Sequence, residues 1–224
     1  MRAFERTARL LGREAVDRLA ASAVAVFGLG GVGSYAAEAL ARAGIGRLLL
    51  VDADVVDETN INRQLVALHS TVGRPKAQVM RERVLVIHPA CRAEARGGVY
   101  PFPLDFTAFD YVADCADTVT AKLALIEACR STGTPVISCM GTGNKLDAGA
   151  FEVSRIEDTS VCPLSRVMRY ELKKRGITGV KCVYSRELPR RTDGERVPAS
   201  VSYVPSSAGL LLAGEIIQDL IRIS

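Results

Sequence analysis

Four glycines in one short stretch stand where a chain could hold a phosphate group. Gly28, Gly30 and Gly33 follow the Val-rich run 23–27 at the spacing G-x-G-x-x-G, and Gly31 adds a fourth glycine. Glycines let the backbone approach a phosphate closely, and the start of a following helix offers free N–H groups and the positive end of its dipole. A tight turn packed against a neighbouring element is the alternative.

An acid beyond these glycines favours phosphate binding over the purely structural turn. Asp52 closes the apolar run 47–51. It lies about 20 residues past the glycines, where a carboxylate accepts hydrogen bonds from ribose hydroxyls. A structural turn would not require an acid at this place. The glycines and Asp52 together predict a nucleotide-binding site.

The chain after Asp52 carries further candidates for the nucleotide site, which are expected beside the ligand crevice. In chain order they are Asp54, Asn60, Arg63, Gln64 and Lys76. The planar guanidinium of Arg63 can donate two hydrogen bonds to one phosphate, and Lys76 could reach a triphosphate as a point charge. An exposed loop arginine and a solvated surface lysine are the alternatives for these two residues taken alone.

Two further acids, Asp114 and Asp117, end the expected strand 109–117. The carboxyl ends of strands in a doubly wound sheet border its ligand crevice, so both acids are expected there. A carboxylate beside nucleotide phosphates is a natural ligand for Mg²⁺. Asp117 could instead cap the helix expected over 118–130, and both roles could hold together.

These side chains need alternating strands and helices to position them, and the sequence shows that alternation. It predicts an α/β doubly wound, Rossmann-like sheet that is mainly parallel, with antiparallel C-terminal strands. We expect strands over 23–27, 47–51, 90–97, 109–117, 135–140 and 149–156. We expect helices over 4–19, 34–43, 76–88 and 118–130, and a basic helix within 159–176. Residues 200–224 are expected to form a strand, a Pro-Ser-Ser turn and a closing helix.

The whole chain, 1–224, is expected to be one domain. The core nucleotide site would occupy 23–145, and the C-terminal basic segment and closing helix would occupy 146–224. The first helix should bury one face, for which the candidates are Leu10, Leu11, Ala15 and Leu19.

Composition limits the class of protein. Hydrophobic residues make up 48% of the chain, enough for a sizeable core and too many for disorder. The net charge of +4 permits a nucleic-acid partner without requiring one. No secretory signal is present, and the most apolar stretch, 208–221, is interrupted by charged and polar residues. We therefore expect a cytoplasmic protein with no membrane partner.

Cysteines and histidines offer little chemistry of their own. The six cysteines contain no C-x-x-C pair, so a structural zinc site is not expected and the thiols should be reduced and mostly buried. His69 and His88 are isolated and are interpreted as structural. Cys162 precedes a helix, where a thiol pKa can fall, but no base stands near it in the sequence, which favours a non-catalytic role.

A dense basic run lies near the C-terminal end of the chain. Arg166, Arg169, Lys173 and Lys174 fall within the expected helix of 159–176. Such a helix could contact RNA phosphates. A charged, solvated helix face is the more usual explanation of such a run.

The motifs taken together resemble the E1-like adenylating superfamily of ThiF, MoeB and HesA type. The resemblance is carried by the G-x-G-G-V-G run, the D-x-D at Asp52, the N-x-N-R-Q run of 60–64, Lys76, and D-x-x-x-x-K at 117–122. Within that superfamily the chain is most similar to the tRNA threonylcarbamoyladenosine dehydratase family. The pointers are the missing zinc cysteines, the D-T-V-T-A-K segment, the run around 163–169 and the closing Y-V-P-S-S-A-G-L.

The resemblance implies a role for each site residue. Asp52 would hold the ribose of ATP, and Asn60, Arg63, Gln64 and Lys76 would contact its phosphates. Arg63 would reach across a homodimer into the partner's site, and Asp117 would bind Mg²⁺. The reaction would be dehydration of threonylcarbamoyladenosine at position 37 of a tRNA, through an acyl-adenylate. The basic run would face the tRNA, and a sulphur-transfer partner is possible.

Three other functions compete with this one. An adenylyltransferase that activates a ubiquitin-like or sulphur-carrier protein would share the ATP site. An NAD-dependent oxidoreductase would use the glycines and Asp52, but would not need Arg63, Lys76 and Asp117 together. A non-catalytic scaffold could bind nucleotide with the same residues.

Overall fold

A seven-stranded sheet forms the centre of the computed structural model, which describes residues 2–190 and 198–222. The strand order is β3-β2-β1-β4-β5-β7-β6, and all neighbours pair in parallel except β6 and β7. The strands are β1 (Ala23–Phe27), β2 (Arg47–Val51), β3 (Arg92–Arg96), β4 (Tyr111–Asp114), β5 (Val136–Cys139), β6 (Phe151–Arg155) and β7 (Lys181–Ser185). The predicted doubly wound, mainly parallel sheet is confirmed.

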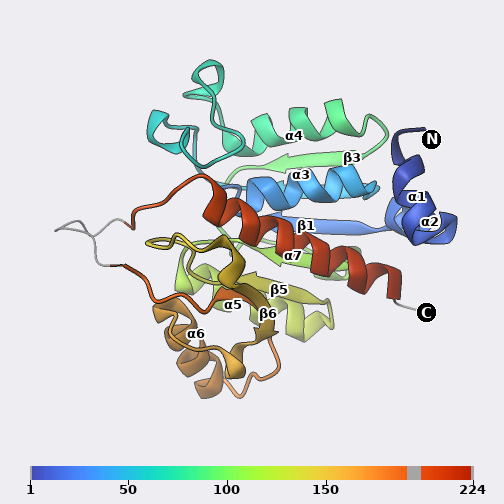
Figure 1. Cartoon of the computed structure of the whole chain (residues 1–224). Coiled ribbons are helices and arrows are strands. Elements are labelled where there is room, and N and C mark those ends of the chain that lie inside the picture. Colours follow the sequence, from blue (N-terminus) through green and yellow to red (C-terminus); the bar gives the residue numbers. More distant parts are fainter. Residues whose placement is uncertain (1, 191–197, 223–224) are drawn as a thin grey trace.

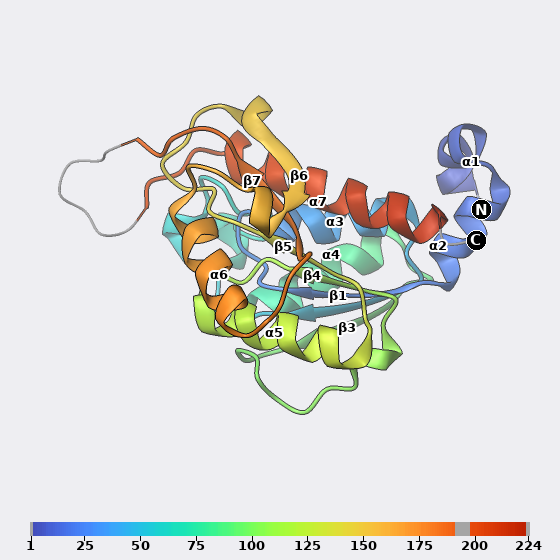
Figure 2. The ribbon, with the colours of Figure 1, turned by 90° about the horizontal axis from the view of Figure 1, so that it is seen from below.

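Helices cover both faces of the sheet, as Figures 1 and 2 show. One face carries α3 (Gly33–Ala43), α4 (Lys76–Ile87) and α7 (Tyr203–Arg222). The other face carries α5 (Val119–Thr132) and α6 (Pro163–Lys174). The carboxyl ends of the parallel strands therefore meet at one edge, between the two helical layers.

Strand β1 shows why its sequence reads as a continuous apolar run. Val24 and Val26 pack in the core beneath α3 and α7, while Ala25 and Phe27 pack on the opposite face against the layer that contains Leu125. Successive side chains of a strand point to opposite faces, so a strand covered on both sides must be apolar throughout. Burying each such large side chain stabilises the fold by about 1.5–3 kcal/mol.

The N-terminal residues form two helices, α1 (Glu5–Leu11) and α2 (Arg13–Ala21), so the prediction of one helix over 4–19 is wrong. Gly12 separates them with a φ of +90°, outside the helical region. Leu10 and Leu11 are consequently exposed, whereas Ala15 and Leu19 are buried as expected. The periodic pattern continues across Gly12, which hides the break from sequence reasoning.

The C-terminal segment also differs from its prediction. The expected strand and Pro-Ser-Ser turn are absent from the described residues there, because α7 already begins at Tyr203. Pro205 lies in the first turn of α7, where a missing N–H costs nothing. Strand β7 was not predicted, because its polar ends obscure a buried centre. The loop expected over 188–198 lies partly outside the described residues, at 191–197.

Helix α7 is long and apolar enough to cross a membrane by length and composition, contrary to the expectation that no stretch would be. Half of its apolar window is buried inside the molecule. A Cβ added at Gly209 would lie 2.2 Å from the carbonyl oxygen of Val32, so α7 and the start of α3 are in close backbone contact. α7 therefore packs as a core helix of the molecule. Its length and composition are only weak evidence that it crosses a membrane.

Candidate functional site

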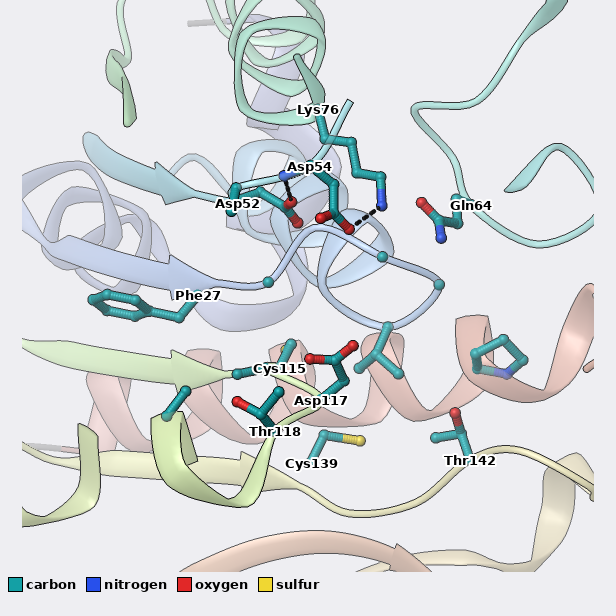
Figure 3. A pocket seen from close by; sticks show the side chains of 18 of the residues that line it. Phe27, Asp52, Asp54, Gln64, Lys76, Cys115, Asp117, Thr118, Cys139 and Thr142 are labelled. Carbon is teal, nitrogen blue, oxygen red and sulfur yellow. Dashed lines mark hydrogen bonds and ion pairs between the residues drawn. The ribbon is translucent and has the colours of Figure 1, made fainter. Parts of the chain in front are cut away.

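A cavity of about 720 Å³ opens at the carboxyl ends of the central strands. Figure 3 shows Asp52, Asp54 and Lys76 on one side of the glycine turn and Asp117, Cys139 and Thr142 on the other. Of the predicted nucleotide-binding residues, those lining the cavity are Gly28, Gly30, Gly31, Asp52, Asp54, Asn60, Arg63, Gln64, Lys76 and Asp117. The structure thus brings together residues from Gly28 to Asp117, which are 89 positions apart in the sequence.

The four glycines divide into two kinds. A Cβ at Gly28 would lie 2.5 Å from the carbonyl oxygen of Cys115, and one at Gly33 would lie 1.7 Å from that of Gly28. These two glycines allow the turn to pack against β4 and against the start of α3, and Gly33 does not line the cavity. Gly30 and Gly31 border the cavity itself. Close packing and close ligand approach therefore both require glycine here.

Asp52 and Lys76 are fixed by their neighbours at the cavity wall. The Asp52 carboxylate accepts hydrogen bonds from the N–H groups of Leu29, at 2.5 Å, and Asp54, at 2.8 Å. Burial raises the pKa of Asp52, and these backbone hydrogen bonds oppose the rise. The ammonium of Lys76, only 5% exposed, lies 2.8 Å from the Asp54 carboxylate. The ion pair with the exposed side chain of Asp54 thus holds the Lys76 ammonium at the cavity wall. A phosphate of a ligand could take the place of the Asp54 carboxylate.

The 60–64 turn presents its polar groups in different ways. Asn60 accepts a hydrogen bond from the Asp57 N–H and closes a capping box, so part of its role is structural. Arg63 donates to the carbonyl of Thr59 at 3.0 Å and lines the cavity. Gln64 is 8% exposed, and its Oε1 has no hydrogen-bond partner within the described chain. A buried, unpaired amide oxygen beside a cavity is suited to a ligand's donor group.

Asp117 is the charged residue of the opposite wall. Its side chain is exposed and lines the cavity, with no ion pair or hydrogen bond to any residue that the structure describes. The N-cap of α5 is Thr118, so the alternative prediction that Asp117 caps this helix is wrong. Asp114 was expected beside it, but Asp114 is fully buried and ion-paired with Lys122. Asp114 is the last residue of β4, so the alternation of side chains along the strand still sets its direction, and its side chain points into the interior toward Lys122. The loop that carries Asp117 begins only after Asp114.

Residues that were not named individually as site residues complete the opposite wall. Cys139, the last residue of β5, and residues 140–143 after it line the cavity together with Leu164, Pro198, Ser200 and Pro205. Asn144, in a left-handed conformation, pairs with Ala199 through hydrogen bonds of 2.8 and 2.7 Å, which brings 198–200 to the cavity. The position of 141–143 directly after a strand was the available signal, since Asp52 occupies the same kind of place.

Comparison with known proteins now decides the family. A family model described as the ThiF family matches residues 4–223. The chain belongs to the ThiF family. A relative from Bacillus subtilis named tRNA threonylcarbamoyladenosine dehydratase is 41% identical over 240 residues, covering 98% of this chain and 94% of that protein.

Solved structures agree with this ThiF-family assignment. The fold is similar to that of Escherichia coli tRNA N6-threonylcarbamoyladenosine dehydratase in complex with AMP, with a TM-score of 0.91 and 34% identity. The same protein in complex with ATP gives a TM-score of 0.90, also at 34% identity. Each comparison covers 98% of this chain and 94% of the other chain.

The basic helix of this ThiF-family chain, α6, lies beside the cavity rather than inside it. Leu164 in its first turn lines the cavity, whereas the four predicted RNA contacts do not. Arg166, Lys173 and Lys174 are exposed, while Arg169 is half-buried and its Nε has no hydrogen-bond partner in the described part of the chain.

An aromatic side chain that sequence reasoning missed lies between these cations. Tyr170 is 61% exposed, and the ammonium of Lys174 lies 5.4 Å from the centre of its ring. A helix places residues four apart on one face, which would have revealed Tyr170 between Arg166 and Lys174.

Most cysteines of this ThiF-family member are buried, as predicted. All six cysteines are free, and burial raises the pKa of Cys139 to about 12. Cys162 is the buried N-cap residue of α6, outside the cavity lining. His88 is buried against the ring of Phe4, and burial lowers its pKa.

Proposed function

We propose that this protein catalyses the ATP-dependent dehydration of N6-threonylcarbamoyladenosine at position 37 of tRNA. The observation that carries the proposal is the one cavity in which Asp52, Arg63, Lys76 and Asp117 converge, in a chain 34% identical to a dehydratase crystallised with ATP. The B. subtilis relative, similar over almost its whole length, carries the same activity in its name. The proposal includes tRNA as the substrate and the cytoplasm as the location of the protein.

The reaction proceeds in two steps, adenylation of a carboxylate and then ring closure. The free carboxylate of the threonyl group attacks the α-phosphate of ATP, the bond to the β-phosphate breaks, and pyrophosphate leaves. The resulting acyl-adenylate has an activated carbonyl carbon. An atom of the neighbouring carbamoyl group attacks that carbon, AMP departs with the former carboxylate oxygen, and the carbamoyl group releases an N–H proton to solvent. A ring closes, and the modified nucleoside has lost the elements of one water.

The residues of the cavity act by positioning and by stabilising charge. Asp52 would accept hydrogen bonds from the ribose hydroxyls, and the backbone at Gly30 and Gly31 would lie along the phosphates. Arg63 and Lys76 would stabilise the charge that develops when pyrophosphate leaves. Holding the carboxylate in line with the α-phosphate would supply much of the remaining acceleration.

Asp117 fits the requirements of a magnesium ion shared with the nucleotide. Mg²⁺ is usually held by one or two carboxylates together with substrate phosphates and water. The Asp117 carboxylate is exposed to the cavity and engaged by no other described residue, so it is free to act as such a ligand. When bound, the ion would neutralise phosphate charge.

We further propose a homodimer in which Arg63, which lines the cavity of its own chain, also reaches the partner's site. Arg63→Ala and Asp117→Ala should each be inactive and folded, because neither side chain is in the core. Mixing the two variants would create dimers with one intact site if Arg63 acts across the interface, restoring about a quarter of the activity for a two-fold dimer. No recovery after subunit exchange would show that Arg63 serves its own subunit.

The α6 surface would contact the tRNA. Arg166, Lys173 and Lys174 supply exposed positive charge for phosphates, and Tyr170 supplies a ring on which a base could stack. The helix rises about 1.5 Å per residue, so Tyr170 lies about 9 Å along the axis from the cavity-lining Leu164. A nucleotide in the cavity and its neighbours could therefore touch both.

The decisive experiment is mass spectrometry of nucleosides from threonylcarbamoyl-modified tRNA incubated with the protein, ATP and Mg²⁺. The expected result is a nucleoside lighter by one water, together with AMP and pyrophosphate. Omission of ATP and the Asp117→Ala variant are the controls. Unchanged tRNA, with adenylation of a small carrier protein instead, would identify a carrier adenylyltransferase.

A further inference from the structure

Three polar side chains meet in the interior directly behind the Asp117 loop. They come from the last residue of β4, the beginning of α5 and the middle of β5, and all are 0% exposed: Asp114, Lys122 and Ser138. The Lys122 ammonium lies 3.2 Å from both the Asp114 carboxylate and the Ser138 hydroxyl. Ser138 donates to the same Asp114 oxygen at 2.6 Å. We call these residues the buried triad.

Stability alone gives a poor account of the buried triad. Removing two charges from water is costly, and apolar side chains of similar volume often replace a buried ion pair without loss of stability. Lys122 is nevertheless the largest fully buried side chain of the described residues. Buried ionic groups are better suited to fixing one arrangement of the chain than to raising its stability.

The arrangement that the buried triad fixes is the loop between β4 and α5. Asp114 precedes this loop and accepts a hydrogen bond from the Ala116 N–H at 3.1 Å. Lys122 follows the loop on α5, so both ends of 115–118 are tied to one carboxylate. All four loop residues line the cavity, and Asp117 is among them.

The same loop is locked to the glycine turn. The Cys115 carbonyl lies so close to Gly28 that a Cβ there would be 2.5 Å away. The Cys115 N–H also donates to the Phe27 carbonyl at 2.8 Å. The position of the Asp117 backbone relative to the phosphate-binding turn is therefore set from the interior, through the buried triad, and from the neighbouring strand.

We infer that Asp114, Lys122 and Ser138 are positioning residues that hold Asp117 where it can bind the metal of a nucleotide–Mg²⁺ complex. They touch neither substrate nor metal and act through the loop. The inference rests on the proposed function only for the nucleotide and its metal, and does not depend on the tRNA reaction.

The test replaces the buried triad by apolar side chains, with Asp114→Leu, Lys122→Met and Ser138→Ala combined. Calorimetric titration with ATP in MgCl₂ should show an affinity loss of about tenfold or more, as for other residues that orient a metal ligand. Affinity for AMP in EDTA, where Asp117 has no metal to bind, should change by less than about threefold. Thermal unfolding checks that the variant is folded. The control, Glu38→Gln with Arg83→Met, removes a different ion pair, 2.6 Å apart, between a buried glutamate and a partly exposed arginine, and should leave ATP affinity unchanged.

A double-variant comparison separates positioning from a general structural role. Adding the triad replacement to Asp117→Ala should cause no further loss of Mg²⁺-dependent affinity, because the triad acts only through Asp117. Full addition of the two losses, or wild-type ATP affinity in the folded triad variant, would overturn the inference.

A milder substitution keeps the test decisive if the triad variant does not fold. Ser138→Ala should weaken Mg²⁺-dependent ATP binding by about threefold, and only when Asp117 is present. No loss would contradict the inference. A wild-type protein that binds ATP with Mg²⁺ but leaves modified tRNA unchanged would refute the proposed function and not the role of the triad.

Discussion

The two walls of the cavity are built in different ways. The first wall comprises residues 28, 30–32, 52–54, 60, 63–64 and 76, all within one continuous stretch of the sequence. The second wall comprises residues 115–118, 139–143, 164, 198, 200 and 205, which reach the cavity from separate parts of the chain. Figure 3 shows Asp52, Asp54 and Lys76 on one side of the glycine turn and Asp117 and Thr142 on the other.

Charge is distributed unequally between these walls. Four of the charged residues that line the cavity belong to the first wall: Asp52, Asp54, Arg63 and Lys76. The second wall contributes Asp117 and otherwise small, polar or apolar side chains. Binding of phosphates requires positive charge and hydrogen-bond donors, whereas binding of the modified base requires a cavity of matching shape that is open to the tRNA. We infer that the first wall, together with Asp117, binds ATP and its metal, and that the rest of the second wall admits the modified base.

The strongest way to break this comparison is to remove a cation of the first wall. Arg63→Ala should lower the dehydration rate by about 10²–10³-fold, the usual cost of one donor that stabilises developing charge. Its bonds to Thr59 and Asn62 are at the surface, so the unfolding temperature should change little. Arg63→Lys keeps the charge but loses the fork, and should recover only part of the rate.

Steady-state kinetics over a range of tRNA concentrations, at saturating ATP, would measure the effect of Arg63→Ala on the rate and on the KM for tRNA. An Arg63→Ala enzyme with a normal rate and a raised KM for tRNA alone would assign Arg63 to the acceptor instead, and the division of labour between the walls would fail.

A second test uses two glycines of the glycine turn, Gly30 at the cavity and Gly33 behind it. Gly33→Ala places a Cβ 1.7 Å from the Gly28 carbonyl oxygen. Overpacking costs about 1–3 kcal/mol even where side chains can move, and here the obstacle is backbone, so a loss of at least about 3 kcal/mol is expected. Gly30→Ala meets only Gln64, at 3.8 Å, and should leave the free energy of unfolding unchanged.

The Gly30→Ala methyl group would instead face the cavity. ATP affinity should fall by about tenfold, equivalent to about 1.4 kcal/mol. Gly97→Ala is the matched control, since nothing lies within 4 Å of its added Cβ. Chemical denaturation and calorimetry distinguish the three variants. Equal ATP affinity for Gly30→Ala and Gly97→Ala would mean that the phosphates lie elsewhere.

The difference between the two walls also explains which parts of the site could be predicted from the sequence. The β1–α3–β2 unit, its glycines and Asp52 were foreseen because every signal lies within about 30 consecutive residues of a known kind of unit. Arg63, Lys76 and Asp117 were found through motif resemblance, and the structure places them in one cavity.

The second wall could not be assembled from local signals. Its partners meet only because α6, α7 and β5 pack together, and periodicity carries no information on such long-range contacts. Asp114 illustrates the limit. Three positions from Asp117, it was expected at the cavity, yet the turn of the chain buries it beside Lys122. Which of two neighbouring acids faces a ligand depends on strand register and loop geometry.

A third test concerns α6, which borders the second wall. Tyr170→Ala should weaken tRNA binding by about tenfold, because stacking on an aromatic ring is worth about 1–3 kcal/mol per base. Tyr170→Phe keeps the ring and should bind normally. Lys173→Glu should also weaken binding and should reduce the slope of affinity against salt, whereas Tyr170→Ala should not alter that slope.

Filter binding of tRNA at several salt concentrations gives both quantities for α6. ATP affinity should be unchanged in all three variants, since neither Tyr170 nor Lys173 lines the cavity. Normal tRNA binding by Tyr170→Ala and Lys173→Glu would leave α6 as an ordinary solvated helix.

The smallest expected effect sharpens the role of the second wall itself. Thr142 lines the cavity opposite Lys76. Thr142→Val removes its hydroxyl but preserves its shape, so the loss of one hydrogen bond, about 1 kcal/mol, should raise the KM for modified tRNA by about fivefold. Thr142→Ser keeps the hydroxyl and should retain most of the wild-type KM. Steady-state kinetics at saturating ATP measures this KM, and calorimetry should show unchanged ATP affinity. The reverse pattern, weakened ATP binding with a normal KM for tRNA, would show that the nucleotide rather than the acceptor lies against the second wall.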